Sequence, residues 1–426
     1  MTIGAFVKAG GAPECEPGQA AAAEASTGEN AMSSPTIVSK RPLTVLQLVP
    51  ELNAGGVERG AIEIVQAICA AGGRAIVASA GGRLALRVTQ SGGELVKLPL
   101  ASKSPLAMVR NSFRIENLIR EEKVDLVHAR SRAPAWSAYW ATKRIGARFM
   151  TTYHGAYSEN LPAKRLYNSV MAKGQPVIAI SDFIAELIQE QHEIQKEQIR
   201  VIPRGADTSV FSEQRTSAAR VRALAEPWRL DDDFRPVLML PGRLTRWKGQ
   251  TLFLEAMAIL KQKIGVEAFQ GLIVGGGAED APMSKFEREL RQQIEKLGIA
   301  DVVRLVGHCD DMPAAYQLAA YAVSASLEPE AFGRVAVEAQ AMGVPVIASA
   351  HGGAMETVVD HKTGWLFQPS SAEALAERLR QALSLSQQER KAMGEAAAEH
   401  VRANFSVGRM QERTLKVYEE AAGRSF

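Results

Sequence analysis

The segment at residues 326–346 reads SLEPEAFGRVAVEAQAMGVPV and lies between two short apolar runs. Residues 320–324, before it, are expected to form a buried strand, and a second strand is expected to begin at Pro345. A helix between them is predicted to begin near Phe332. A strand, a helix and another strand in this order predict a parallel sheet with a crossover helix.

The same alternation extends over most of the chain, with an interruption at residues 212–235. The predicted strands are residues 43–49, 74–79, 94–98, 124–128, 148–154, 176–180, 236–240, 271–275, 302–307, 320–324 and 345–349. The pattern predicts an α/β protein with two tandem Rossmann-like domains. Because ligands bind outside the carboxyl ends of such strands, a cleft between the two domains is the expected site.

Composition places the chain among soluble globular proteins, with 426 residues, 46% hydrophobic and 23% charged. The net charge of +3 argues against a polybasic protein, so no nucleic-acid partner is expected. Cys15, Cys69 and Cys309 have neither zinc-site spacing nor the number that a disulfide framework needs. They favour a reducing, cytoplasmic location.

Residues 1–41 differ from the rest because they are rich in Ala, Gly, Glu, Ser and Pro. Their apolar run at residues 4–7 is too short for a secretory signal, and we expect a disordered tail. The sequence contains no uninterrupted apolar stretch of about 18 residues, so no transmembrane helix is predicted.

Two carboxylates stand out in the segment quoted first. Glu330 lies in the loop before the predicted helix, whereas Glu338 shares a helical stripe with the apolar Val335 and Met342. A buried carboxylate needs a partner, and sugar or ribose hydroxyls are suitable. The alternative is an ordinary helix-start acid and an unrelated helix-interior acid. Gly333, at the helix N-terminus, would expose backbone N–H groups to a phosphate.

A basic cluster follows the strand predicted at residues 236–240. Arg243 and Lys248 are five residues apart, between Gly242 and Gly249. An Arg fork and a Lys point charge can hold one diphosphate. The alternative is two solvated basic residues, but cations oppose the dipole of a helix N-terminus unless an anion is bound.

Two further clusters close strands of the first series. Gly55 and Gly56 precede a helix and would let a ligand approach the backbone closely, although a plain tight turn is the alternative. His154, beside Gly155, could exchange hydrogen bonds with a substrate, with a structural histidine that caps a loop as the equally weighted alternative. For His128 we favour a structural role.

Taken together, these clusters resemble a retaining glycosyltransferase of the GT-B fold, in family 4, which uses nucleotide sugars. The resemblance runs from about residue 43 to residue 418. The most specific feature is the pair of glutamates with seven residues between them, Glu330 and Glu338. The supporting motifs are Gly55-Gly56, His154-Gly155, Ser181-Asp182, Pro203-Arg204-Gly205-Ala206-Asp207, Gly242-Arg243, Lys248-Gly249 and Gly352-Gly353-Ala354-Met355-Glu356.

The resemblance implies roles for the residues of the second domain. Arg243 and Lys248 would hold the donor diphosphate and stabilise the leaving group. Glu330 would bind hydroxyls of the donor sugar, and Glu338 would bind the ribose. The backbone N–H groups around Phe332 and Gly333 would assist the phosphate.

For the first domain, the resemblance implies that His154 contacts the sugar or the reacting centre. Gly55 and Gly56 would leave room for the acceptor and the β-phosphate. Reaction by front-face departure would keep the anomeric configuration without an acidic nucleophile. No cofactor and no metal are expected, since the run of acids at residues 231–233 lies in the linker, where a solvated acidic run is favoured.

Domain boundaries follow from the same resemblance. Residues 42–206 would form the acceptor-side domain, and residues 207–404 the linker with the nucleotide-sugar domain. Residues 405–426 would form a helix that returns to the first domain.

The acceptor is expected to bind the first domain, where residues 97–173 hold 14 Lys and Arg against 5 Asp and Glu. Arg110, Arg114, Arg130 and Arg132 contribute, among aromatic residues such as Trp136. This composition suits an anionic glycan or lipid-linked acceptor, or contact with an anionic membrane at its inner face. Ordinary helix surface is the equally weighted alternative. The resemblance favours synthesis of lipopolysaccharide core or of cell-surface polysaccharide.

Three other functions stay open at this point. A sugar-nucleotide 2-epimerase shares the fold and binds a similar donor. An oxidoreductase is suggested by Gly275-Gly276-Gly277 after a strand, but the dinucleotide fingerprint is incomplete. A sugar-binding protein without catalysis would be expected to lack the basic pair or the carboxylates, and both are present.

Overall fold

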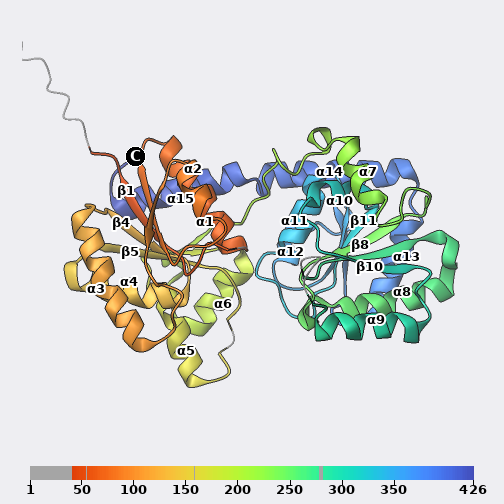
Figure 1. Cartoon of the computed structure of the whole chain (residues 1–426), viewed down its shortest axis with the longest axis horizontal. Helices are drawn as coiled ribbons and strands as arrows, with labels where there is room; N and C mark the ends of the chain where they lie inside the picture. The colour runs from red at the N-terminus through yellow and green to blue at the C-terminus, as the bar shows by residue number, and fades with distance from the viewer. Residues whose placement is uncertain (1–40, 54, 158, 278–281) are drawn as a thin grey trace, which may run out of the picture. The chain divides into compact units, whose positions relative to one another are not determined.

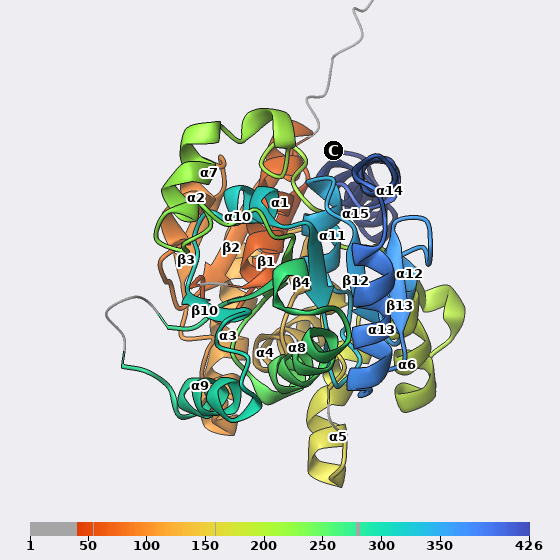
Figure 2. The same ribbon diagram turned by 90° about the vertical axis from the view of Figure 1, so that its right-hand side faces the viewer.

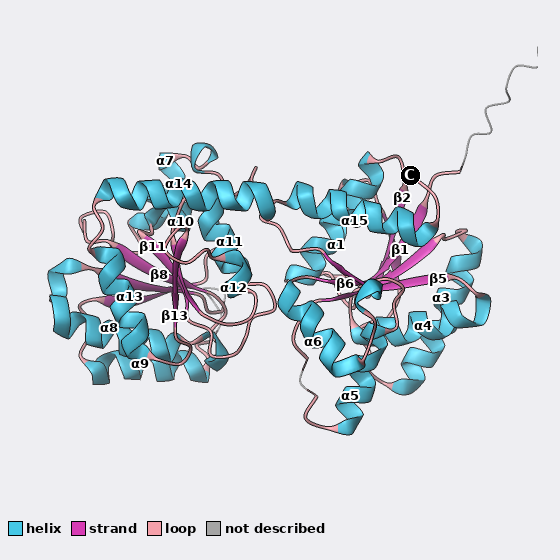
Figure 3. Ribbon diagram, turned by 180° about the vertical axis from the view of Figure 1, so that it is seen from behind, coloured by secondary structure: helices cyan, strands magenta, loops and turns pink. Residues whose placement is uncertain are grey.

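The computed structural model describes residues 41–426 except residues 54, 158 and 278–281 (Figure 1). The tail predicted at residues 1–41 therefore lies outside the described residues, apart from Arg41. The described chain contains two parallel sheets, each with helices on both faces (Figures 1 and 3).

The first sheet has the strand order β3-β2-β1-β4-β5-β6-β7. Leu46 of β1 pairs with Ile76 of β2 on one side and with Val127 of β4 on the other. The order reverses between β1 and β4, which is where sheets of this kind bind ligands. The strands are β1 (Thr44–Leu48), β2 (Arg74–Ser79), β3 (Glu94–Lys97), β4 (Leu126–Ala129), β5 (Arg148–Tyr153), β6 (Val177–Ala179) and β7 (Ile199–Val201).

The second sheet has the order β10-β9-β8-β11-β12-β13 and reverses between β8 and β11. Leu238 of β8 pairs with Gly271 of β9 and Tyr321 of β11. The strands are β8 (Val237–Pro241), β9 (Gln270–Val274), β10 (Val303–Gly307), β11 (Tyr321–Ser324), β12 (Val346–Ser349) and β13 (Gly364–Phe367). The two sheets confirm the predicted α/β class with two Rossmann-like halves.

The helices pack on the sheets through apolar faces, and α8 and α13 lie side by side (Figure 2). Within the described ranges, none of the helices combines the length and apolar character needed to cross a bilayer. The helices are α1 (Gly56–Ala70), α2 (Ala85–Gln90), α3 (Pro105–Glu121), α4 (Arg132–Ile145), α5 (Pro162–Ser169), α6 (Asp182–His192), α7 (Ala218–Ala225), α8 (Gln250–Ile264), α9 (Lys285–Leu297), α10 (Met312–Leu318), α11 (Arg334–Ala341), α12 (Ala354–Thr357), α13 (Ala372–Leu383), α14 (Gln387–Asn404) and α15 (Val407–Ala422).

The sequence prediction missed the edge strands β7 and β13. They have three and four residues, and neither lies within a longer apolar run as the equally short β6 does at residues 176–180. The predicted linker contains α7, which packs on α10. The acidic run at residues 231–233 is solvated only in part. Asp233 lies 2.7 Å from Arg235, whose guanidinium lowers the pKa of that carboxyl to about 2.

Helix α3 presents an apolar stripe to solvent. Leu106, Val109 and Phe113 are 61%, 41% and 56% exposed. The face that packs on α4 uses other positions, including Met108 and Ile115. Only part of the apolar surface of this helix therefore belongs to the core.

The final helix, α15, packs against α1, β4 and β5 of the first sheet. Its Tyr418 is fully buried, and the hydroxyl lies 2.6 Å from Nδ1 of His128. The other ring nitrogen of His128 lies 2.7 Å from Oγ1 of Thr152. Both nitrogens are thus used within the protein, which agrees with a structural role for His128.

Tyr418→Phe is expected to lower the free energy of unfolding by about 1–3 kcal/mol, because it leaves a buried ring nitrogen of His128 without its partner. Urea denaturation monitored by circular dichroism measures the change. Lys416→Ala is the matched control on the exposed face of α15 and should cost less than about 0.5 kcal/mol. Equal stability of Tyr418→Phe and the wild-type protein would contradict this account of the contact.

Candidate functional site

A cavity of about 640 Å³ lies where strands of both sheets end. Gly56 reaches it after β1, His154 after β5 and Arg204 after β7. From the second sheet, Arg243 follows β8, and residues 328–334 connect β11 to α11. The site therefore forms at carboxyl ends of parallel strands, as the topology requires.

Lys248 and Glu330 form an ion pair in this cavity. Nζ of Lys248 lies 2.7 Å from Oε1 of Glu330, and both side chains are at most 15% exposed. The hydroxyl of Ser326 also donates to the Glu330 carboxylate. Lys248 is the last residue of a short helical turn, and Gly249 follows it with φ of +73°. A Cβ on Gly249 would lie 1.8 Å from the carbonyl oxygen of Ala325. Glycine at this position thus lets the Lys248 turn approach the strand that leads to Glu330.

Arg243 lies on the same wall as Lys248. Its side chain is exposed, and it has no hydrogen bond or ion pair to a side chain in the described part of the chain. Gly242 precedes it with φ of +149° and does not itself line the cavity. The guanidinium is therefore free to meet an anion.

The N-terminus of α11 opens onto the cavity without a side-chain cap. Phe332 and Gly333 form its entry, and Gly333 has φ of +83°. A backbone hydrogen bond fixes the loop that precedes α11, because the Gly353 N–H donates to the carbonyl oxygen of Glu330 at 2.8 Å. A Cβ on Gly353 would lie 2.4 Å from Cα of Phe332. The uncapped N–H groups at this helix start suit a phosphate.

Glu338 lies behind this wall and does not line the cavity. Its carboxylate is 3.2 Å from the Arg334 guanidinium, and Arg334 does line the cavity. Burial raises the pKa of Glu338, and Arg334 opposes that shift. The predicted contact between Glu338 and a ribose stays a prediction.

The start of α1 faces the start of α11. A Cβ on Gly56 would lie 3.6 Å from Cδ of Arg334, so Gly56 keeps the approach open. Gly55 is the N-cap of α1 with φ of +141°, has no side-chain cap and does not line the cavity.

His154 and Arg204 form the floor that belongs to the first sheet. Nη2 of Arg204 lies 2.9 Å from Nδ1 of His154, while Nε2 of His154 is buried without a partner among the described residues. Burial, followed by the charge of Arg204, lowers the pKa of His154 well below its usual value. Burial and the nearby Arg130 lower the pKa of Arg204 to about 9.

Two motif residues connect the segments around the cavity. The Glu356 carboxylate accepts from the N–H groups of Asp182 and Phe183, at 2.9 and 2.8 Å, where α6 begins. The Ser181 hydroxyl donates to the carbonyl oxygen of Ala331 at 2.6 Å. These contacts join the α6 start to the loop that carries Glu330.

Of the residues predicted for the site, the cavity brings together seven, namely Gly56, His154, Arg243, Lys248, Glu330, Phe332 and Gly333. Gly55, Gly242 and Glu338 adjoin it. Sequence reasoning gave no role to Arg204, Trp247 or Arg334, which also line it. Arg204 follows a strand too short to be predicted, and this hid its position at a strand end.

The cavity carries an excess of positive charge. Among the described residues, its lining has four basic side chains, namely Arg204, Arg243, Lys248 and Arg334, against two acidic ones, Glu328 and Glu330. Such a lining suits a diphosphate. Within the described ranges, no three His, Cys, Asp or Glu side chains gather as a metal site would require.

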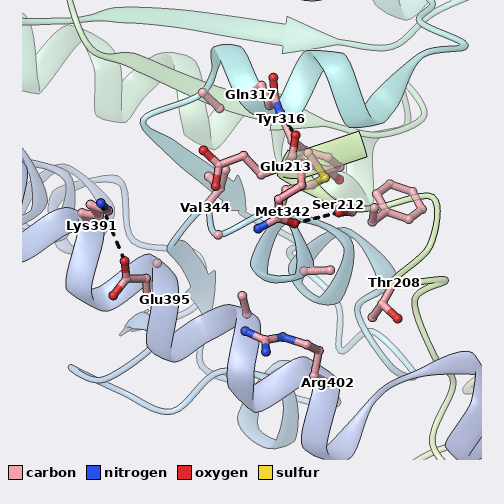
Figure 4. A pocket seen from close by; sticks show the side chains of 17 residues that line it. Thr208, Ser212, Glu213, Tyr316, Gln317, Met342, Val344, Lys391, Glu395 and Arg402 are labelled. Atoms are coloured by element: carbon pink, nitrogen blue, oxygen red, sulfur yellow. Dashed lines mark hydrogen bonds and ion pairs between the residues drawn. The ribbon is translucent and has the colours of Figure 1, made fainter. Parts of the chain in front are cut away.

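A second cavity, of about 530 Å³, lies beside α10 and α14 (Figure 4). Tyr316, Met342 and Arg402 are among its lining residues, and Lys391 pairs with Glu395 at its rim. None of the described residues that line it belongs to the predicted site. The predicted site residues therefore gather in the cavity that contains Lys248 and Glu330, and not in this one.

Each half of the chain matches a known protein family. Residues 54–210 match the family described as Glycosyltransferase Family 4, and residues 226–400 match Glycosyl transferases group 1. The crystal structure of a glycosyltransferase from Rickettsia africae is 35% identical, with a TM-score of 0.81, and the match covers 90% of this chain and 100% of that one.

Two further relatives agree with this placement. A D-inositol 3-phosphate glycosyltransferase from Corynebacterium urealyticum is 34% identical over 293 residues, 66% of each chain. The chain spans between 52% and 66% of the length of the Corynebacterium relatives of that name that it matches. Anabaena HepE, solved with UDP and glucose, is 22% identical, with a TM-score of 0.75 and coverage of 89% of this chain and 100% of that one, and supports the fold alone. The chain therefore belongs to the family 4 glycosyltransferases, whose two Rossmann-like halves form the GT-B fold.

Proposed function

We propose that this protein transfers a hexose from a nucleotide sugar to a hydroxyl of a glycan or lipid-linked acceptor, with retention of the anomeric configuration. The observation that carries the proposal is the ion pair of Lys248 and Glu330, which shares one electropositive cavity with Arg243 and the uncapped start of α11. This arrangement offers cations and N–H groups to a diphosphate, and a carboxylate to sugar hydroxyls.

In the proposed reaction, the bond between the sugar C1 and the β-phosphate oxygen breaks as the acceptor oxygen bonds to C1 from the same face. The acceptor proton passes to the departing phosphate, so the products are a glycoside and a nucleoside diphosphate. Arg243 and Lys248 stabilise the charge that develops on the phosphate. Glu330 orients the sugar, and no enzyme carboxylate attacks C1.

The donor is proposed to bind without a metal, because fixed cations stand where a divalent ion would otherwise neutralise the diphosphate. Thermal-shift measurements with UDP-, GDP- and ADP-sugars, each with and without Mg²⁺, test this. A ligand at 100 times its Kd should add about 2.7 kcal/mol of stability. We expect one nucleotide series to stabilise the protein equally with and without Mg²⁺. Stabilisation by none of them, or only with Mg²⁺, would contradict the proposed donor site.

Substitutions at the ion pair separate binding from catalysis. Lys248→Ala should weaken diphosphate binding by about 10- to 150-fold, the equivalent of losing one charged hydrogen bond of 1.5–3 kcal/mol. Glu330→Gln should abolish transfer while the fold persists, because the amide fills the same space.

Isothermal titration with UDP, GDP and ADP, together with product assays, measures these effects. The matched control is Arg246→Ala, two residues from Lys248, because the Arg246 side chain is 70% exposed and pairs with Glu289 instead. Normal turnover by Glu330→Gln would refute the role given to this carboxylate.

The acceptor is proposed to be an anionic, membrane-associated molecule. The exposed stripe of α3, defined by Leu106, Val109 and Phe113, is bordered by the exposed Arg110 and Arg114. Apolar side chains beside basic ones are typical of a helix that lies on an anionic bilayer. Arg130, counted with the basic surface in the sequence prediction, is instead buried beneath the cavity and contributes nothing to this surface.

Two acceptor classes are compatible with this proposal. Lipopolysaccharide core, or another cell-surface polysaccharide, is built at the inner face of the inner membrane, where a peripheral enzyme would work from the cytoplasmic side. The inositol phosphate in the name of the Corynebacterium relatives is the second class. Both are anionic. A sugar-nucleotide 2-epimerase remains the alternative, and product analysis with and without acceptor separates it from a transferase.

Vesicle co-sedimentation tests the membrane proposal. The protein should bind phosphatidylglycerol vesicles at low salt, bind phosphatidylcholine vesicles poorly, and lose affinity as salt rises. Leu106→Ser together with Phe113→Ser should reduce binding by about tenfold or more, because each removes apolar area that would enter the bilayer. Phe234→Ser is the matched control, because Phe234 is 95% exposed outside the stripe. Absence of binding to anionic vesicles would exclude this surface as a membrane contact.

A further inference from the structure

The contact between Arg204 and His154 constrains the protonation of the imidazole. A guanidinium only donates hydrogen bonds, so Nδ1 of His154, 2.9 Å from Nη2 of Arg204, must accept. An imidazolium would present an N–H at that nitrogen and would conflict with the arginine. The ring is therefore neutral, and its single proton lies on Nε2.

The proton on Nε2 has no partner within the protein. Nε2 is buried and unpaired among the described residues, and His154 lines the cavity proposed to hold the donor sugar. A buried donor without a partner is costly, so it is typical of an atom that a ligand satisfies. A sugar hydroxyl or a phosphate oxygen can accept this hydrogen bond.

The position of Arg204 is itself set by two helices of the first sheet. A Cβ on Gly60 of α1 would lie 1.8 Å from Nη1 of Arg204, so only glycine leaves space for the guanidinium. On the other side, Nη1 lies 3.9 Å from Sδ of Met410 in α15. The arginine is 7% exposed, and these neighbours leave the guanidinium little room to move.

We propose that Arg204 is a positioning residue that holds His154 as the neutral tautomer with its proton on Nε2. His154 is thereby a hydrogen-bond donor to the donor substrate and cannot act as a base toward the acceptor. This inference rests on the proposed transferase function and deepens it, because the acceptor proton is left to the departing phosphate.

The charged and titratable groups that act on His154 come from several elements. Arg204 and Arg130 disfavour the imidazolium, and so does His128. The carboxylates of Glu58 and Glu63 on α1 raise the pKa of Arg204, whereas burial and Arg130 lower it. None of these groups supplies a hydrogen-bond acceptor to Nε2 among the described residues.

Nitrogen-15 NMR of histidine-labelled protein tests the inference without any turnover. The His154 signals, assigned by their loss in His154→Gln, should show a protonated Nε2 and a bare Nδ1 at neutral pH and below the ordinary pKa of an imidazole. Arg204→Leu should give mixed tautomers and raise the pKa of His154, while burial and Arg130 still hold that pKa below its ordinary value. Arg204→Lys, which keeps a donor, should preserve the tautomer.

Two further variants keep the test decisive. If Arg204→Leu fails to fold, Gly60→Ala provides a second test, because its methyl group displaces the Arg204 guanidinium from α1. Alanine favours a helix, so Gly60→Ala should fold and give the His154 spectrum expected of Arg204→Leu. Arg200→Leu is the matched control, because Arg200 of β7 pairs with Glu420 and does not contact His154. It should leave the spectrum of His154 unchanged.

A protonated Nδ1 in the wild-type protein, or an unchanged His154 spectrum in both Arg204→Leu and Gly60→Ala, would overturn the inference. Where transfer is measurable, Arg204→Leu should lower kcat by about 10- to 100-fold, as loss of an oriented donor does. If the tautomer is as expected but no sugar is transferred by the wild-type protein, the proposed function fails, whereas the positioning role of Arg204 stands.

Discussion

Two buried guanidinium groups, those of Arg130 and Arg204, impose the constraint on which the first half of the site depends. They are 3% and 7% exposed, and neither pairs with a carboxylate in the described part of the chain. A buried guanidinium that pairs with no carboxylate is tolerated only when neutral groups accept its hydrogen bonds. Gln47, Tyr418 and His154 do so, and their placement fixes α15 and the cavity floor together.

In the second half of the site, by contrast, a partly buried cation does pair with a carboxylate. Lys248 and Glu330 neutralise each other, so the wall that carries them is stable without a ligand. Arg243 stays free, and the start of α11 stays uncapped. An incoming diphosphate would thus find one unpaired cation, open N–H groups and a lysine that can exchange its partner.

The carboxylate, glycine and basic motifs could be read from the sequence because each follows a predicted strand. Parallel topology brings strand ends to one edge, and this is why distant residues such as His154 and Lys248 line the same cavity. Arg204 was quoted within a motif but given no role, because nothing local distinguishes a buried arginine from a solvated one. Arg334 likewise received no role. Glu338 was recognised as a buried carboxylate, but its partner in the structure is Arg334.

The sequence by itself determined the α/β class, the two series of strands and seven of the residues that line the cavity, because apolar periodicity and glycine positions are local properties. Only the tertiary structure decided which stripe of α3 stays exposed and that Tyr418 of α15 meets His128. It also decided that Arg204 holds His154. These outcomes depend on contacts between residues up to 290 positions apart, and the spacing of residues along the chain carries no signal for such contacts.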